Sequence, residues 1–311
     1  MSLKRLRTEE DGAVAIVFVL LLVPLLAIAA LVVDVGGGYV QKRKLQNATD
    51  AVAMAIAQDC AGGVCGNTAL TAQTLVTANA GAATAVVTIT GSSVTVRGAA
   101  AVNYRFAPAI GIRSSSVHTT SSARWGAPSG ATSVLPLMFS WCSFAAQTGG
   151  GVPTGTTAVT INFAKTDGTT DCTGPSGNPV PGGFAWIQTL PGTCTAKTAT
   201  GVAQTFSDPG NSVPNSCSTN DIGASQNQTV LLPIFDKFGG TGGGAWYHAY
   251  AYAAFRLTGY YFGGQYKWNN PCSGNARCIR GYFTKMVDIS EGATFSTTAP
   301  NLGSSIIALT A

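Results

Sequence analysis

The sequence predicts an α+β protein in which a long N-terminal transmembrane helix precedes a mainly-β, disulfide-stabilised extracytoplasmic body, either a sandwich or a partly open barrel. Three observations predict this class. Residues 13–33 contain no charged side chain. Only 10% of the 311 residues are Asp, Glu, Lys or Arg, and 38 glycines lie among many Thr, Ser, Ala and Val residues, which is typical of β-rich surface proteins rather than cytosolic enzymes. All eight cysteines follow the apolar segment, which indicates an oxidising compartment.

The apolar segment at residues 13–33 is long enough to cross a bilayer. At about 1.5 Å per residue it forms a helix of roughly 31 Å, which matches the hydrocarbon core. A cleaved secretory signal is the alternative, because Lys4, Arg5 and Arg7 precede the segment and residues 27–29 (Ala-Ile-Ala) have the form of a cleavage site. The apolar character continues past that site to Val33, so we expect the helix to stay in the membrane.

A second helical stretch follows at residues 39–58. Its apolar residues recur at helical spacing on one face, and the basic residues 42–44 fall mainly on the other side. We therefore expect a transmembrane helix and its extension over residues 13–61. Three basic residues flank the span on each side, so charge alone does not orient it. The short tail at residues 1–12 and the cysteines beyond the span predict a single-pass protein of the cell membrane, with a cytoplasmic N-terminus and an extracytoplasmic body.

The remaining chain is expected to form two β-containing parts. Residues 62–126 predict a small helix-plus-β unit, with a helix at 67–80 capped by Asn67 or Thr68, a hairpin of 85–90 with 94–98, and strands at 101–106 and 116–125. Gly, Ala, Pro and Ser at residues 127–132 predict a linker. Residues 133–311 predict a Cys-rich, mainly-β domain, with strands expected at 133–141, 157–164, 183–189, 229–236, 245–262, 278–290 and 293–298.

The eight cysteines favour disulfides over a metal site. Zinc sites usually contain C-x2-C pairs or nearby histidines, whereas the closest pairs here are separated by four and five residues. The connectivity does not follow from spacing alone, although we favour Cys60–Cys65 and Cys272–Cys278. The complete set of candidates is Cys60, Cys65, Cys142, Cys172, Cys194, Cys217, Cys272 and Cys278.

No catalytic constellation is evident in the sequence. The two histidines, His118 and His248, lie far apart, and no G-x-S-x-G motif occurs. We therefore expect no enzyme activity and no catalytic, cofactor-binding or metal-binding residues. The net charge of +5 is small and no basic run alternates with aromatic residues, so we expect no nucleic-acid partner. Whether the body binds a small molecule stays open.

Residues 11–57, DGAVAIVFVLLLVPLLAIAALVVDVGGGYVQKRKLQNATDAVAMAIA, resemble the N-terminal segment of TadE/TadG-like proteins of tight-adherence (Flp-type) pilus assembly systems. The resemblance is carried by Gly12-Ala13-Val14-Ala15, Pro24, Asp34, Tyr39, Arg43, Leu45-Gln46-Asn47-Ala48 and Asp50-Ala51. A weaker similarity continues over residues 106–126. Pilin-like members carry a Glu a few residues into the apolar helix, where this chain has Val17, so the resemblance is to a TadG-type accessory protein rather than a major pilin. Some TadG-like proteins also carry a von Willebrand factor A domain. The nearest match to its D-x-S-x-S motif, DISEG at residues 288–292, lacks the second Ser, so we expect no such domain.

The resemblance implies a membrane-anchored, non-enzymatic accessory or structural component of the pilus assembly system. Its pilin-like N-terminal helix would pack in the lipid bilayer against other pilus-assembly or pilin-like proteins, since small side chains let helices approach closely. The residues expected to serve anchoring and helix packing are Gly12, Val17, Pro24, Ala27, Ala30, Asp34, Gly36 and Gly37. The alternative is a secreted or surface-attached binding or adhesin module, released by signal cleavage, in which the aromatic strand at residues 246–262 holds a ligand.

Overall fold

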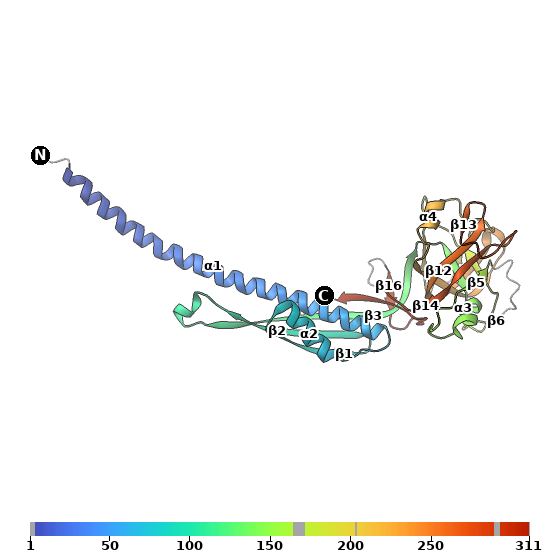
Figure 1. The fold of residues 1–311 in the computed structure, drawn as a ribbon, viewed down its shortest axis with the longest axis horizontal. Helices are drawn as coiled ribbons and strands as arrows, with labels where there is room; N and C mark the ends of the chain where they lie inside the picture. Colours follow the sequence, from blue (N-terminus) through green and yellow to red (C-terminus); the bar gives the residue numbers. More distant parts are fainter. Residues whose placement is uncertain (1–3, 164–171, 203, 289–292, 311) are drawn as a thin grey trace.

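The computed structural model describes residues 4–163, 172–202, 204–288 and 293–310, with side chains from Val14 onward. A long helix extends away from two β-sheets that follow one another along the molecule (Figure 1). The helices are α1 (Lys4–Ala61), α2 (Thr68–Ala80), α3 (Trp141–Thr148) and α4 (Thr219–Gly223), with the 3-10 turns η1 (Ala107–Ile110) and η2 (Gly242–Gly244). The α+β class, with a long apolar N-terminal helix and a β-rich body containing four disulfides, is confirmed.

The first sheet lies beside the C-terminal half of α1. Its strands are β1 (Ala83–Thr90), β2 (Ser93–Asn103), β3 (Ser114–Ser133), β9 (Ala196–Ala199), β15 (Met286–Asp288), β16 (Thr294–Ser296) and β17 (Ser304–Thr310). The main order is β1-β2-β3-β17-β15, and β16 and β9 pair with the later part of β3. The predicted helix with its Asn67 cap and the predicted hairpin are confirmed, because the Asn67 side chain accepts the Leu70 N–H and β1 pairs antiparallel with β2.

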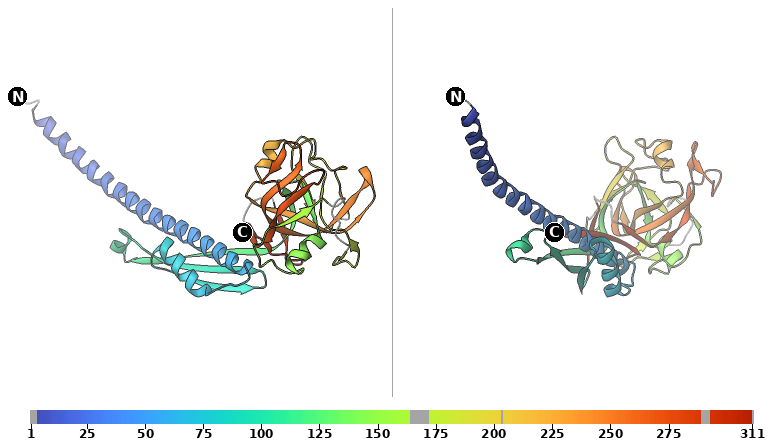
Figure 2. Two further views of the ribbon diagram at one scale, coloured as in Figure 1. Left: turned by 45° about the vertical axis from the view of Figure 1, so that its right-hand side comes forward. Right: turned by 60° about the vertical axis from the view of Figure 1, so that its left-hand side comes forward.

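The second sheet forms the body at the far end of the molecule and curves around its own core (Figure 2). Its order is β5-β14-β12-β11-β4-β8, and β10 and β13 also pair with β12. The strands are β4 (Leu137–Ser140), β5 (Val159–Asn162), β8 (Phe184–Trp186), β10 (Thr205–Phe206), β11 (Thr229–Gly239), β12 (Trp246–Gly263), β13 (Tyr266–Trp268) and β14 (Cys278–Thr284). A separate pair consists of β6 (Cys172–Thr173) and β7 (Pro179–Val180).

Two main hydrophobic cores hold these parts together. One lies between α1, α2 and the first sheet and contains Leu45, Val52, Ile56, Val76 and Val96, all fully buried. The other fills the body and is rich in aromatic rings, such as the ring of Phe139, which lies 4.9 Å from Phe255 and 5.5 Å from Phe283 between centroids. Edge-on and tilted pairs of this kind add to the stabilisation from burial.

The linker expected at residues 127–132 is wrong as local structure, because this stretch lies inside the 20-residue strand β3. Its small residues serve close packing rather than flexibility. A Cβ on Gly126 would lie 2.7 Å from the Ser296 carbonyl oxygen, and one on Gly130 would lie 2.7 Å from the Thr294 hydroxyl. Strand β16 therefore approaches β3 at a distance that larger side chains would prevent.

The C-terminal strand also departs from the expected division of the chain. Residues 133–311 were expected to form one domain, but β17 returns to the first sheet and pairs antiparallel with β3, with Ile306 opposite Gly126 and Thr310 opposite Ser122. The separate strand expected at residues 101–106 is wrong too, because β2 continues unbroken to Asn103. Strand β3 thus runs through the whole first sheet: its first part pairs with β2 and β17 and its last part with β16 and β9.

Candidate membrane-anchoring and helix-packing site

The N-terminal half of α1 is apolar and exposed on all sides. Among the described residues one helix, from Val14 onward, is long and apolar enough to cross a membrane. Of residues 14–33, all but Ala30 are exposed, and Ala30 is half-buried. A core helix of comparable hydropathy would be covered by its own chain, so the exposed apolar surface calls for a non-aqueous environment.

The C-terminal half of α1 packs on the first sheet. Leu45, Ala48, Val52 and Ile56 recur every three or four residues and are completely buried, as their spacing predicts. The helix comes close to strand β2 at Gly98, where a Cβ would lie 2.5 Å from the Thr49 methyl group. One continuous helix therefore has an exposed apolar half and a half that is fixed to the first sheet (Figure 1).

Polar residues of the LQNATDA stretch hold α1 against β3. The Gln46 amide donates to the Asp50 carboxylate and to the Ser121 hydroxyl, both at 2.9 Å. The Ser121 hydroxyl is 2.5 Å from that carboxylate. Thr49 lies 3.2 Å from Thr119, oxygen to oxygen, in the same buried layer. Buried polar groups that are fully hydrogen-bonded fix a single packing arrangement, so these residues set the register between helix and strand.

Asp34 marks the end of the exposed apolar half and binds a distant segment of the chain. Its carboxylate accepts the backbone N–H groups of Arg105 at 2.7 Å, Phe106 at 3.0 Å and Ala107 at 2.7 Å. These residues lead into η1, at the end of the β2–β3 ribbon that runs back along α1 toward the N-terminus (Figure 2). Asp34, itself buried, therefore couples the end of the apolar half of α1 to the β2–β3 ribbon.

The other predicted anchoring residues differ in their surroundings. Val17, Pro24 and Ala27 are exposed within an unbroken helix, and Gly36 and Gly37 have open space where a Cβ would lie. Gly12 belongs to the helix but precedes the residues whose side chains are described. Val17, Pro24, Ala27, Gly36 and Gly37 are thus accessible on the described surface, and a role in packing against other helices stays a prediction.

The cysteines form four disulfides. The two favoured pairs, Cys60–Cys65 and Cys272–Cys278, are both present, with Cα–Cα distances of 4.0 Å and 6.3 Å. The first closes the loop between α1 and α2. The other two pairs, Cys142–Cys172 and Cys194–Cys217, join segments 30 and 23 residues apart within the body.

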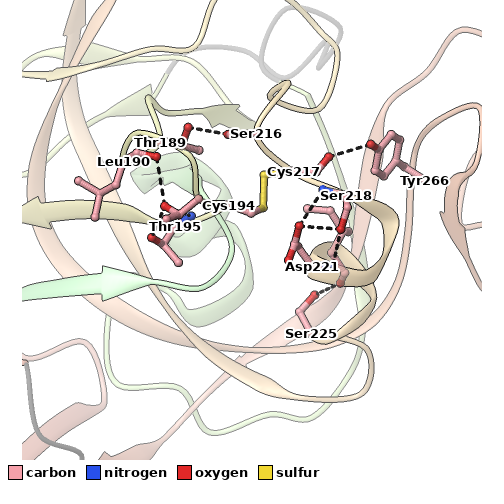
Figure 3. Close-up of a disulfide and its surroundings, with 12 residues drawn as sticks. Thr189, Leu190, Cys194, Thr195, Ser216, Cys217, Ser218, Asp221, Ser225 and Tyr266 are labelled. Carbon is pink, nitrogen blue, oxygen red and sulfur yellow. Dashed lines mark hydrogen bonds between the residues drawn. A yellow bond between two sulfur atoms is a disulfide. The ribbon is translucent and has the colours of Figure 1, made fainter.

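The Cys194–Cys217 disulfide joins two loops that carry their own hydrogen bonds (Figure 3). Tyr266 donates to the Cys217 carbonyl at 2.8 Å. Ser218 and Asp221 form a capping box at the start of α4, in which the Ser218 hydroxyl and its backbone N–H hold the pKa of the Asp221 carboxyl below its usual value. The arrangement stabilises long loops.

One polar cluster in the body resembles the components of a catalytic site. The His248 Nδ1 lies 2.6 Å from the Asp236 carboxylate, which is completely buried, and Ser176 donates to the other oxygen of the same carboxylate. The carboxylate lies between the hydroxyl and the imidazole, whereas an activated serine needs the imidazole nitrogen on its own hydroxyl. This cluster holds the loop between β6 and β7 against β11. The expected absence of catalytic, cofactor and metal sites stays a prediction.

A second candidate surface is an apolar pocket of about 440 Å³ lined by residues that include Phe238, Trp246 and Tyr247. Most other aromatic residues of β12 face the core, since Tyr252, Phe255, Tyr260 and Phe262 are buried. Of the strand expected to hold a ligand, residues 246–262, Trp246 and Tyr247 line this pocket, and ligand binding stays a prediction.

Sequence reasoning missed two features of the anchoring site. No element is predicted between the strands expected at 101–106 and 116–125, although Pro108 and Gly111 in FAPAIGIR are turn signals. The hydrogen bonds of Gln46 and Asp50 to Ser121 join residues about 70 positions apart. No single-sequence pattern reports such distant pairs. The DISEG match to a von Willebrand factor A motif lies mostly at residues 289–292, outside the described residues, so the absence of that domain stays a prediction.

Comparison with known proteins identifies the segment that forms α1. Residues 12–59 match the family model described as "Putative Flp pilus-assembly TadE/G-like". Neither the curated proteins nor the solved structures gave a match to the chain. The matched residues cover both the exposed apolar half and the packed half of α1, and they include Asp34, Gln46 and Asp50. By this N-terminal segment, the chain is similar to TadE/TadG-like proteins.

Proposed function

We propose that this chain is a single-pass, non-enzymatic accessory protein of a tight-adherence pilus assembly system. The observation that carries the proposal is the division of α1 into an apolar half with no cover from its own chain and a half seated on a β-sheet. Such a helix anchors a body to a bilayer and keeps it at a fixed distance. The match of residues 12–59 to the TadE/G-like family supports the assignment to pilus assembly.

The proposed orientation has the N-terminus in the cytoplasm and the body outside. The four disulfides support it, because disulfides persist in oxidising compartments. Lys42, Arg43 and Lys44 are exposed on α1 about 13–17 Å beyond Val33, where they can contact lipid head groups or an acidic partner.

The proposed partners are other membrane-anchored pilus-assembly or pilin-like proteins that pack against α1. Ala27, Gly36 and Gly37 support this, since small exposed residues let a second helix approach closely in lipid. Val17 replaces the glutamate of pilin-like members, and its apolar side chain offers no carboxylate to pair with a neighbouring subunit's amine. The protein therefore fits an accessory position beside the filament better than a place in the shaft.

The anchoring is tested by fractionating cells and sequencing the mature N-terminus of the native protein. We expect an intact apolar segment in the membrane fraction that is extracted by detergent and not by alkaline carbonate. A mature N-terminus at Ala30 would show secretion and contradict the anchored form. An N-terminus at Ala13 would show prepilin-type processing and contradict the accessory position.

The partner is tested with a photo-reactive amino acid at Ala27, within the exposed half of α1. We expect a cross-linked product that contains an identified pilin or pilus-assembly protein. The same amino acid at Val64, an exposed position beyond the end of α1, is the control. Equal cross-linking from both positions, or cross-linking only to unrelated membrane proteins, would contradict the proposed packing.

A secreted binding or adhesin module is the second candidate. The observation in its favour is the apolar pocket beside Trp246 and Tyr247. Removal of residues 1–29 would leave Asp34 and the packed half of α1 in place, so a cleaved body would keep its core. The mature N-terminus decides between the two candidates.

A further inference from the structure

The segment at residues 104–113, here called the tip, carries apolar side chains into the open. It contains η1 and forms the end of the β2–β3 ribbon (Figure 2). Phe106 is 52% exposed, Ile110 is 79% exposed and Ile112 is 51% exposed. Three large apolar side chains exposed within seven residues are unusual for a turn in contact with water.

The tip lies beside the same part of α1 that is proposed to lie in the membrane. A groove of about 610 Å³ separates the two, lined on one side by helix residues from Leu26 to Val35 and on the other by tip residues from Tyr104 to Ile112. Leu26 lies eight residues before Asp34, which is about 12 Å along the helix axis. A bilayer that covers Val14 to Val33 therefore extends over the level of the groove.

Entry into a bilayer favours a backbone whose polar groups have partners inside the protein, and seven N–H groups of the tip have such partners. Asp34 accepts the N–H groups of residues 105, 106 and 107. Four more N–H groups donate to carbonyl oxygens within the tip, from Tyr104 to Arg113, from Ala109 to Phe106, from Gly111 to Pro108 and from Ile112 to Ala107. A turn without these bonds would pay a large desolvation cost in lipid.

The residues around the apolar side chains are those found at membrane–water interfaces. Tyr104 lies at one side of the tip, and Arg105 and Arg113 flank the apolar stretch with exposed side chains. Tyrosine rings favour the head-group level, and long basic side chains reach from an apolar surface to phosphate groups. These interfacial residues, and the position of the tip at the same level as the membrane span, favour lipid as the binding partner. Binding to another protein would not require the tip to lie at that level.

We propose that the tip inserts into the leaflet on the body's side of the bilayer that α1 crosses, and that Asp34 holds it there. The inference rests on the proposed membrane anchoring. A single helix leaves the body free to rotate about the helix axis and to tilt. A second contact beside the helix fixes both, so the tip sets the orientation of the β body relative to the membrane.

Depth-dependent fluorescence quenching in vesicles tests this proposal on the full chain. Three variants each add one tryptophan: Ile110→Trp in the tip, Leu20→Trp in the middle of the span and Val64→Trp beyond α1. Val64 is a matched control for Ile110, since their exposed fractions are 78% and 79%. Each protein is reconstituted into phosphatidylcholine vesicles with bromine at carbons 6 and 7 or at carbons 11 and 12 of the acyl chain. The wild-type signal of the native tryptophans is subtracted.

We expect Ile110→Trp to lose at least a third of its added fluorescence, more with the shallow bromines than with the deep ones, and Val64→Trp to lose almost none. If Leu20→Trp is quenched while Ile110→Trp behaves like Val64→Trp, the tip lies outside the bilayer and the inference is wrong. If Leu20→Trp is not quenched, the helix does not span the membrane and the proposed anchoring fails with it.

The role of Asp34 as a positioning residue is tested in the Ile110→Trp protein. Adding Asp34→Ala to the Ile110→Trp protein should reduce the quenching of the tip tryptophan to near the level of Val64→Trp. Adding Asp34→Ala to the Leu20→Trp protein should leave the quenching of that tryptophan unchanged. Asp59→Ala, which removes an exposed carboxylate from the same helix, is the control and should change nothing. Unchanged quenching after Asp34→Ala would show that the tip is held without Asp34.

Discussion

Replacing Val52 with Ala tests whether the packed half of α1 stabilises the first sheet independently of the body. Val52 is 0% exposed and belongs to the core that contains Val94 and Val96. The change removes two buried methyl groups, and at ~0.8 kcal/mol each their loss lowers the free energy of unfolding by about 1.6 kcal/mol. A cavity of about 40 Å³ adds about 1 kcal/mol at ~24 cal/mol per Å³. The expected loss is therefore about 2.5 kcal/mol in the free energy of unfolding of this unit.

Hydrogen exchange measured by mass spectrometry on the full chain in detergent micelles locates the loss. A decrease of about 2.5 kcal/mol accelerates exchange through cooperative opening by about 70-fold, since ~1.36 kcal/mol is a factor of ten. The acceleration should occur in peptides from α2, β1 and β2. Peptides from β11 and β12 should be unchanged, because they belong to the separate aromatic core of the body.

Val40→Ala is the matched control, because it removes the same two methyl groups from the same helix at a residue that is 51% exposed. Its effect should stay within about 0.5 kcal/mol. The reasoning is refuted if Val52→Ala accelerates exchange equally in the peptides from α2, β1 and β2 and in those from β11 and β12. It is also refuted if Val52→Ala and Val40→Ala have the same effect.

Three further predictions concern other parts of the fold. Burial raises the pKa of Tyr252, so its contribution to stability is present below the ordinary tyrosine pKa of 10.0 and is lost as the pH rises through the raised value. The near-UV circular dichroism of the wild type should therefore change above about pH 10, and a Tyr252→Phe variant with the same alkaline profile would contradict this. Deleting residues 304–311 should accelerate hydrogen exchange in β3 more than in β12, because β17 pairs with β3, and the reverse order would show that the C-terminal strand stabilises the body. Replacing Cys194 and Cys217 together with Ser should lower the stability of the body by about 3 kcal/mol through loop-closure entropy, and an unchanged thermal transition would argue against that role.

The sequence predicts those elements that depend on local pattern. The apolar segment at residues 13–33 and the helical spacing from Leu45 to Ile56 predict α1, and both halves of it are present. The Asn67 cap and the hairpin of β1 with β2 follow from short-range turn and cap signals in the same way. The two short disulfides could be favoured because the cysteines of each pair lie a few residues apart.

Tertiary structure decides the features that depend on distant contacts. Residues 127–132 have the composition of a flexible linker, yet close packing against β16 makes them a strand, because Gly126 and Gly130 leave room that composition alone does not reveal. Strands β9, β15, β16 and β17 belong to the first sheet, although most strands of residues 133–311 build the body.

The anchoring site shows the same division. The sequence by itself determines that a helix able to span a membrane begins this chain, since length and hydropathy are local properties. Only the folded chain brings residues 105–107 to the Asp34 carboxylate and sets an apolar turn beside the span, because hydrogen bonds across about 70 residues depend on how β2 and β3 run back along the helix.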